Sequence, residues 1–320
     1  MSRVHINRKD DEAGWLAARH LDITSTDVAA LFGLSPYMTE FELFHRKLAD
    51  APVRIEDNER MVWGRRLEAA IAHGVAEDRN WTIRARNIYQ RDPDARIGSS
   101  FDFTIVATDD RGTGLLEIKN VDGLVFRNSW TVNEDGTIEA PEHIELQLQH
   151  QLEVADLEWG VIVALVGGND VRVLERTREV EIGQVIRTRA KQFWARVASN
   201  EAPAPDFAAD AEFITKTLCR NANADKVIEA NETLDDMIAR YMHVSKEAGD
   251  LDRLKDSIKA EILMTIGDAG KIVSRHATVT CSNTKDSTGT LVTPDMVGTC
   301  IGARKGYRQF RVTAAKGGGK

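Results

Sequence analysis

The stretch GLLEIKNV, residues 114–121, is the best guide to the fold of this chain. In an extended strand alternate side chains share a face, so Glu117 and Lys119 point one way and Ile118 points the other, into a core. An acid, a spacer and a lysine are a weak signal alone. The apolar residues before the triplet and the turn-forming TDDRGTG at 108–114 predict a strand with a chemically active face.

Two alternating stretches precede this strand, WTIRARNIYQ at 81–90 and GSSFDFTIVA at 98–107. We expect all three stretches to be antiparallel neighbours in one sheet. The second carries Asp102 between two phenylalanines, where a carboxylate is costly to bury without a partner. Two carboxylates and one ammonium would then converge at the edge of the sheet.

Helical spacing surrounds these strands and predicts the fold class. Capping chemistry and apolar periodicity predict helices at 10–19, 24–32, from Thr39 onward, 57–77 with Glu68, from Pro141 through 155, and 181–199. Two further strands are expected at 160–168 and 170–178. The chain therefore predicts an α/β core in which helices flank a mixed central sheet.

The proline-containing NEAPAPDF at 200–207 suggests a boundary, so we expect a catalytic domain at 1–205 and an appendage at 206–313. The appendage should hold a long helix or helical hairpin and a small β element, followed by a disordered tail at 314–320. Its apolar residues fit the a and d positions of a heptad interrupted at Lys255: Leu234, Met237, Tyr241, Val244, Ala248, Leu251, Ile258 and Ile262.

Composition limits the class of protein. The net charge of -8 argues against a broad basic surface for coating DNA, so any nucleic acid must be gripped locally. Three scattered cysteines match neither a zinc site nor a disulfide framework. No apolar run reaches the length of a bilayer span, and the N-terminus lacks a secretory signal, so we expect a cytoplasmic protein with no membrane partner.

The acidic cluster suits phosphodiester hydrolysis, which needs an in-line water and neutralisation of charge on the phosphate. Asp102 and Glu117, with Glu68 as an additional ligand, would hold Mg²⁺, although Mn²⁺ would also fit. Lys119 would orient or help deprotonate the water and oppose charge in the transition state. A structural alternative stays open, in which Glu117 and Lys119 form a solvated pair and Asp102 caps a turn.

Four segments in register, GRRLEAAIA, GSSFDFTIV, LLEIKN and IELQLQHQLEV, resemble the YqaJ-like viral recombinase family, to which lambda exonuclease belongs. The resemblance covers about residues 10–200 and implies a restriction-endonuclease-like core of the PD-(D/E)XK type. It places Glu68, Asp102, Glu117 and Lys119 at metal and catalytic positions. Gln147 matches the glutamine of the family's QxxxY-like helix, whereas Gln151 departs from the tyrosine.

The N-terminal segment WLAARHLDITSTDVAALFGLSPY resembles the family segment that lines the DNA path. By that match Arg19, Thr26 and Ser100 would bind a terminal 5′-phosphate, because a guanidinium and hydroxyls are good phosphate donors. Trp15 would stack on a base. The structural alternatives are Thr26 as a plain helix N-cap, which the residues alone favour, and Trp15 as a core residue, which they also favour.

The resemblance also implies an activity and partners. It predicts a Mg²⁺-dependent 5′-to-3′ deoxyribonuclease that acts on double-stranded DNA ends in phage-type recombination and repair. The 3′ single strand would pass to a RecT- or Beta-like annealing protein, in the host cytoplasm if the gene is carried by a phage. Family members can form rings, so a homo-oligomer is an expectation.

Three alternatives remain. An endonuclease on the same core would need a base-reading element, which we do not identify, and a Cas4-like exonuclease would need cluster cysteines. A catalytically inactive protein that binds DNA ends would not need Asp102, Glu117 and Lys119. A coiled-coil scaffold would leave the acidic strands unexplained.

Overall fold

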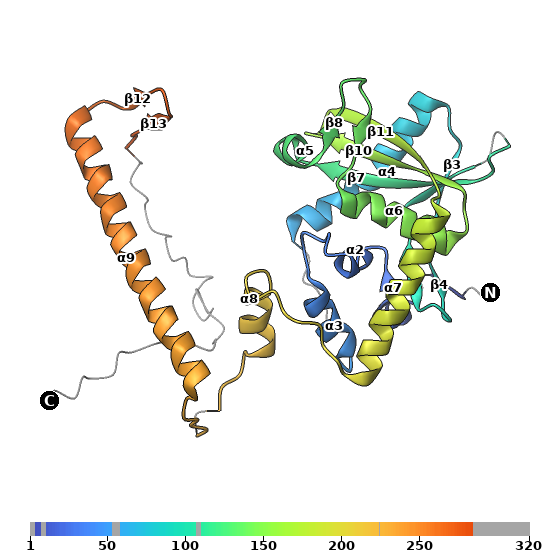
Figure 1. Cartoon of the computed structure of the whole chain (residues 1–320). Coiled ribbons are helices and arrows are strands. Elements are labelled where there is room, and N and C mark those ends of the chain that lie inside the picture. The colour runs from blue at the N-terminus through green and yellow to red at the C-terminus, as the bar shows by residue number, and fades with distance from the viewer. Residues whose placement is uncertain (1–3, 8–10, 53–57, 107–109, 224, 284–320) are drawn as a thin grey trace, which may run out of the picture. The chain divides into compact units, whose positions relative to one another are not determined.

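The computed structural model describes residues 4–7, 11–52, 58–106, 110–223 and 225–283. It divides into two compact units, Met1–Phe213 and Ile214–Lys320 (Figure 1). The first unit therefore ends eight residues beyond the boundary expected at 205. Each unit is described by itself below.

The first unit is built on a five-stranded sheet in the order β11-β10-β7-β6-β3. The central pair, β10 and β7, is parallel, and the other neighbours are antiparallel, so the sheet is mixed as predicted. Its strands are β3 (Ile83–Ala85), β6 (Phe103–Ile105), β7 (Gly114–Val121), β10 (Trp159–Val166) and β11 (Asp170–Thr177).

A second, four-stranded sheet has the order β1-β4-β5-β2. Its strands are β1 (Val4–Asn7), β2 (Ile23–Thr24), β4 (Ile88–Asp92) and β5 (Ile97–Ser100). The prediction that residues 81–90, 98–107 and 114–121 form three strands of one sheet is therefore wrong. The first two stretches each break into two short strands, and one half of each joins the other sheet.

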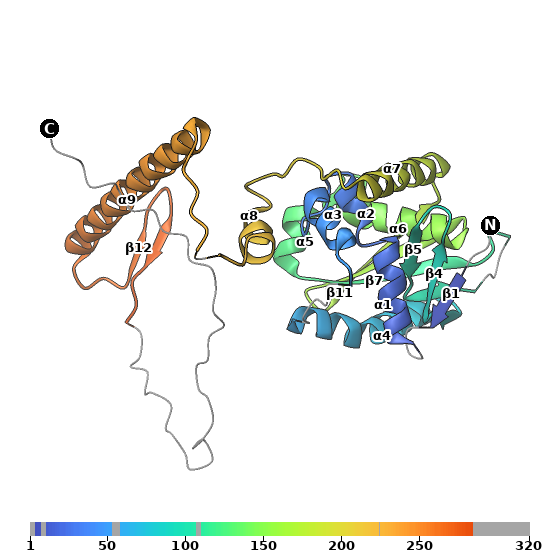
Figure 2. The same cartoon turned by 90° about the horizontal axis from the view of Figure 1, so that it is seen from below.

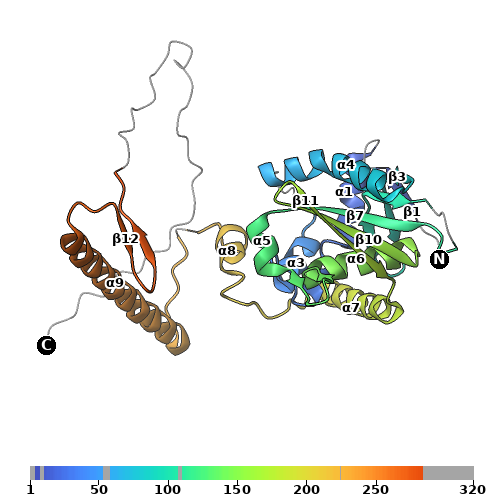
Figure 3. The ribbon, with the colours of Figure 1, turned by 90° about the horizontal axis from the view of Figure 1, so that it is seen from above.

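Helices cover both faces of the five-stranded sheet, which confirms the predicted α/β class. Helix α4 (Glu59–Arg79) lies on one side of β7, and α6 (Glu142–Ala155) and α7 (Val180–Ser199) lie on the other (Figures 2 and 3). The remaining helices of this unit are short: α1 (Glu12–Leu21), α2 (Val28–Leu31), α3 (Glu40–Leu48), α5 (Gly123–Ser129) and α8 (Ala211–Phe213).

The alternation along β7 sorts its side chains between two apolar cores. Leu116 and Ile118 pack with Ile71 and Val75 of α4. Leu115 and Val121 belong to the larger core on the other face, together with apolar residues of α2, α3, α6 and α7. Glu117 and Lys119 therefore point toward α6, because they share a face with Leu115 and Val121.

The second unit begins with a short π-helix, Ile214–Leu218, and contains α9 (Glu232–Ile266), a single helix of 35 residues. The hairpin of β12 (Lys271–Val273) and β13 (Thr278–Thr280) follows. These elements confirm the expected helical and small β appendage. The expected tail at 314–320 lies outside the described residues.

Candidate active site

The glutamate of the central strand is the focus of the site. Glu117 is only 4% exposed, so its charge depends on protein donors instead of water. Its Oε1 accepts hydrogen bonds from Lys119 Nζ and Gln147 Nε2, both at 2.6 Å. Its Oε2 accepts one from Gln151 Nε2 at 2.7 Å. A solvated surface pair of Glu117 and Lys119 is therefore excluded.

Lys119 lies between the strand and helix α6, with about a quarter of its side chain exposed. Besides its ion pair with Glu117, its ammonium donates a hydrogen bond to Gln147 Oε1 at 2.9 Å. Burial lowers the pKa of Lys119, but the Glu117 carboxylate outweighs burial and the pKa is raised overall. A firmly protonated ammonium suits orientation of water and opposition of negative charge better than deprotonation.

Asp102 occupies the bend between β5 and β6, where the chain passes from one sheet to the other. Its Oδ2 accepts a hydrogen bond from the Ile118 backbone N–H at 2.8 Å, which ties it to the central strand. Burial, and then repulsion from Glu117 and Glu68, raise the pKa of Asp102 well above its usual range. The Asp102 carboxylate therefore contacts the central strand and does not cap a turn.

Glu68 reaches this group from α4, on the face of the sheet opposite α6. The Glu68 and Glu117 carboxylates both act electrostatically on Asp102. Within the described part of the chain, no cluster of three or more acidic, histidine or cysteine side chains is already arranged as a metal cage. The donor set nevertheless fits a hard divalent cation, because carboxylates that repel one another when buried are stabilised by a positive charge.

The residues suggested for phosphate binding also lie together, beside the carboxylates. Trp15 Nε1 donates a hydrogen bond to Ser100 Oγ at 3.0 Å, and the Arg19 guanidinium lies 4.8 Å from the Trp15 ring centroid. Arg19 Nη2 contacts Thr26 Oγ1 at 3.4 Å. Thr26 is exposed and is not the N-cap of α2, a position taken by Asp27.

Gln151 connects the two groups and is the functional candidate that the sequence did not reveal. Its side chain, 2% exposed, donates to Glu117 and makes a longer contact of 3.4 Å with the Ser100 carbonyl. The sequence placed it only as a departure from the expected tyrosine. Four-residue spacing from Gln147 on one helix face was the available signal.

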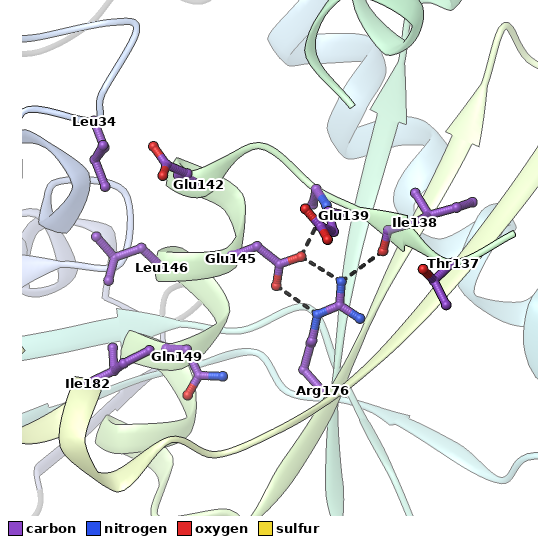
Figure 4. A pocket seen from close by; sticks show the side chains of 11 residues that line it. Leu34, Thr137, Ile138, Glu139, Glu142, Glu145, Leu146, Gln149, Arg176 and Ile182 are labelled. Atoms are coloured by element: carbon purple, nitrogen blue, oxygen red, sulfur yellow. Dashed lines mark hydrogen bonds and ion pairs between the residues drawn. The ribbon is translucent and has the colours of Figure 1, made fainter. Parts of the chain in front are cut away.

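A separate pocket of about 560 Å³ lies on another side of α6 (Figure 4). Its guanidinium, Arg176, is paired to Glu145 through Nη2 at 2.8 Å and Nε at 3.0 Å. Glu139 and Glu142 add further acidic lining. These carboxylates would repel a phosphate, so this pocket is a poor site for DNA.

Residues 14–158 match the family model described as the YqaJ-like viral recombinase domain. The YqaJ protein of Bacillus subtilis (strain 168) is 24% identical over 276 residues, covering 83% of each chain. An alkaline exonuclease from Laribacter hongkongensis is 20% identical, with a TM-score of 0.46 over 59% of this chain and 93% of its own. A phage-related exonuclease from Haemophilus somnus 129PT is 10% identical, with a TM-score of 0.39 over 58% and 99%.

Proposed function

We propose that the protein is a metal-dependent exonuclease, from the premise that residues 14–158 match the model of the YqaJ-like viral recombinase domain. It would degrade double-stranded DNA from 5′ ends and leave 3′ single-stranded tails. The observation that carries the proposal is the convergence of Asp102, Glu117 and Lys119 beside the group formed by Trp15, Arg19, Thr26 and Ser100.

The catalytic roles follow from the charges and contacts. Asp102 and Glu117, with Glu68, would hold Mg²⁺ or Mn²⁺, which when bound neutralises charge on the scissile phosphate. Lys119 would orient the attacking water and oppose charge in the transition state. Gln147 holds both Lys119 and Glu117, so it would keep the ammonium and the carboxylate in register.

Arg19 is the candidate anchor for a terminal 5′-phosphate. Its guanidinium lies against Trp15 and Thr26, which leaves a cation, an indole and a hydroxyl within one small region. A phosphate there would replace the long Arg19–Thr26 contact with charge-assisted hydrogen bonds. Because Ser100 is two residues from Asp102, a nucleotide held by this pocket would present its own phosphodiester near the carboxylates.

Exposed residues of α4 offer a surface for the DNA strand. Trp63 is 51% exposed, and the Arg66 guanidinium lies 5.0 Å from its ring centroid. Arg60 is also exposed on the same helix. Aromatic faces and guanidinium groups are the usual means of holding single strands.

The decisive test is digestion of a linear duplex labelled separately on each strand, with Mg²⁺, Mn²⁺ or EDTA. We expect metal-dependent release of mononucleotides from 5′-phosphorylated ends and no cleavage of closed circular DNA. Cleavage of the circle would instead indicate an endonuclease, and DNA-end binding without any cleavage would indicate an inactive end-binding protein.

Variants assign the roles in the same assay. Asp102→Asn should abolish cleavage and preserve DNA binding, and Lys119→Ala should lower the rate at least about 100-fold, as for loss of a charge-stabilising group. Lys191→Ala, at an exposed lysine of α7, is the matched control. Arg19→Ala should remove the preference for 5′-phosphate over 5′-hydroxyl ends; equal loss on both ends would refute the pocket.

Partners of the proposed reaction follow from its product. The 3′ single strand would be taken up by a RecT- or Beta-like annealing protein, in the cytoplasm of a bacterial host. A ring-shaped homo-oligomer around DNA would make digestion processive. None of the helices in the described residues combines the length and hydropathy required of a bilayer span.

A further inference from the structure

Helix α9 of the second unit has the dimensions of a coiled-coil strand and no buried side chain among its residues. Its 35 residues correspond to about 52 Å of helix. Large apolar side chains are exposed along it: Met237 by 58%, Val244 by 53%, Leu251 by 65% and Ile258 by 48%. Most helices in proteins are stabilised by packing of such a face, which indicates that α9 has a partner.

The exposed apolar residues follow a heptad through the whole helix. Leu234 and Ile262 begin and end the series at a positions, and Lys255 is its polar interruption, also at an a position. Ile238 and Leu254 widen the apolar stripe at neighbouring e and g positions. A stripe of this period matches a second helix with the same period.

We propose that α9 pairs with α9 of a second copy of this chain as an antiparallel coiled coil. The pairing that aligns the heptad series from Met237 to Ile262 is centred between Gly249 and Asp250, so that Ala248 faces the partner's Leu251. Met237 then faces the partner's Ile262, and Val244 faces the partner's Lys255. The proposal rests on residues 231–266 alone and is independent of the nuclease function.

Charge complementarity selects the antiparallel orientation. In a parallel pair, Glu247 would face the partner's Asp252, and Lys255 would face the partner's Lys255. Like charges would therefore meet at both contacts. In the antiparallel pair, Arg240 faces the partner's Glu261. Charges at e and g positions set orientation in coiled coils, and here they oppose the parallel form.

The lysine within the apolar stripe is compatible with this arrangement. Lys255 Nζ is 2.6 Å from Asp252 Oδ1 within the same helix. Its ammonium can therefore stay at the flank while its methylene groups cover the partner's Val244. A single polar residue at an a position costs stability but restricts the register of pairing.

Disulfide trapping tests orientation directly. The full chain, with Cys219, Cys281 and Cys300 replaced by serine, would carry Met237→Cys, Ile262→Cys or both, and be incubated in a glutathione redox buffer. We expect covalent dimers from the double variant and none from either single variant. Self-crosslinking of the single Met237→Cys variant would overturn the proposal in favour of a parallel pair, and absence of any crosslink would overturn pairing between copies.

Charge reversal provides an independent readout by sedimentation equilibrium. Arg240→Glu should weaken the dimer about tenfold, because two attractive contacts become repulsive, and Arg240→Glu with Glu261→Arg should restore it. Lys246→Glu, at an outward f position, is the matched control. The proposal would also be overturned if Glu261→Arg did not restore the dimer weakened by Arg240→Glu, or if Leu251→Asp left the dimer unaffected.

Discussion

Glu117 brings a negative charge to a nearly fully buried position, and three side-chain donors hold it there. Removing one donor from a buried carboxylate costs more than the hydrogen bond itself, because water cannot replace the donor. Gln151 is the donor to Oε2 and touches no other carboxylate in the described contacts. A substitution at Gln151 therefore tests the contribution of this one hydrogen bond to the Glu117 carboxylate.

Gln151→Leu should lower the free energy of unfolding by about 1–3 kcal/mol and the cleavage rate per folded molecule by at least about tenfold. Gln149→Leu is the matched control, since Gln149 is a buried glutamine of the same helix that bonds Thr177 and Glu179. Urea denaturation and rates at saturating DNA would be measured for both. Equal rate losses would mean that Gln151 contributes only to stability.

His150 is the second unusual residue of helix α6. It is completely buried, and neither ring nitrogen makes a well-aligned hydrogen bond to a described residue. Burial lowers the pKa of His150 to about 4. Asp27, the Ile23 carbonyl and Glu153 raise the pKa by smaller amounts, and Arg187 lowers it slightly further. The folded protein therefore keeps this imidazole neutral where the unfolded chain would bind a proton.

The stability of the wild type should consequently fall between pH 6.5 and pH 4. The unfolded chain takes up a proton at His150 below about pH 6.5 and the folded chain does not, so up to about 3 kcal/mol is lost across this window. His150→Leu should remove that part of the pH dependence in urea denaturation. The exposed His5→Ala variant should retain it. A His150→Leu profile parallel to wild type would contradict the assignment.

At the scale of the elements, a break within one predicted strand positions Asp102. The alternation of residues 98–107 continues through Asp102, so the sequence alone predicts one strand. In the structure the chain leaves the four-stranded sheet after Ser100 and enters the five-stranded sheet at Phe103. The bend between them points the Asp102 carboxylate at the backbone of β7.

The helix N-cap predicted at Thr39 is present and has a second role, whereas the Glu42 carboxylate pairs with Arg46 instead of completing a capping box. Thr39 Oγ1 accepts a hydrogen bond from Glu42 N at 3.0 Å and donates one to the buried Asp210. This long-range contact keeps residues near 210 in the first unit. The boundary therefore follows Phe213 instead of the prolines at 203 and 205.

Thr39→Ala should destabilise the first unit by about 2 kcal/mol, from the lost cap and from the donor removed from Asp210. Thr39→Ser keeps the hydroxyl and should stay within about 0.5 kcal/mol of wild type. Thermal unfolding would compare both with Thr188→Ala, an exposed threonine of α7. If the Thr39→Ala variant were as stable as wild type, neither contact would contribute to stability.

At the scale of the whole molecule, the candidate nuclease residues and helix α9 with its heptad belong to different units. Residues 219–231 carry no helix or strand in their described part, and Arg220 and Lys226 are exposed there. Brief trypsin treatment should cleave after these residues and leave a fragment with cleavage activity within about twofold of the intact chain. If DNA cleavage activity fell in proportion to the fraction of chain cut by trypsin, the second unit would contribute to catalysis.

The sequence by itself determined the local features of this protein. Strand alternation placed Glu117 and Lys119 on one face, helical spacing located α4, α6 and α7, and capping chemistry marked Thr39. The resemblance added the family and the identity of the candidate residues. These features depend on neighbours a few residues away, which the sequence displays directly.

Only the tertiary structure decided which separate segments meet. The contact between Trp15 and Ser100 joins residues 85 positions apart, and that between Gln151 and Glu117 joins residues 34 positions apart. The same long-range packing divided two alternating stretches between two sheets. A periodic pattern states which face is apolar but not which surface will cover it, so these choices follow from the packing of the whole unit.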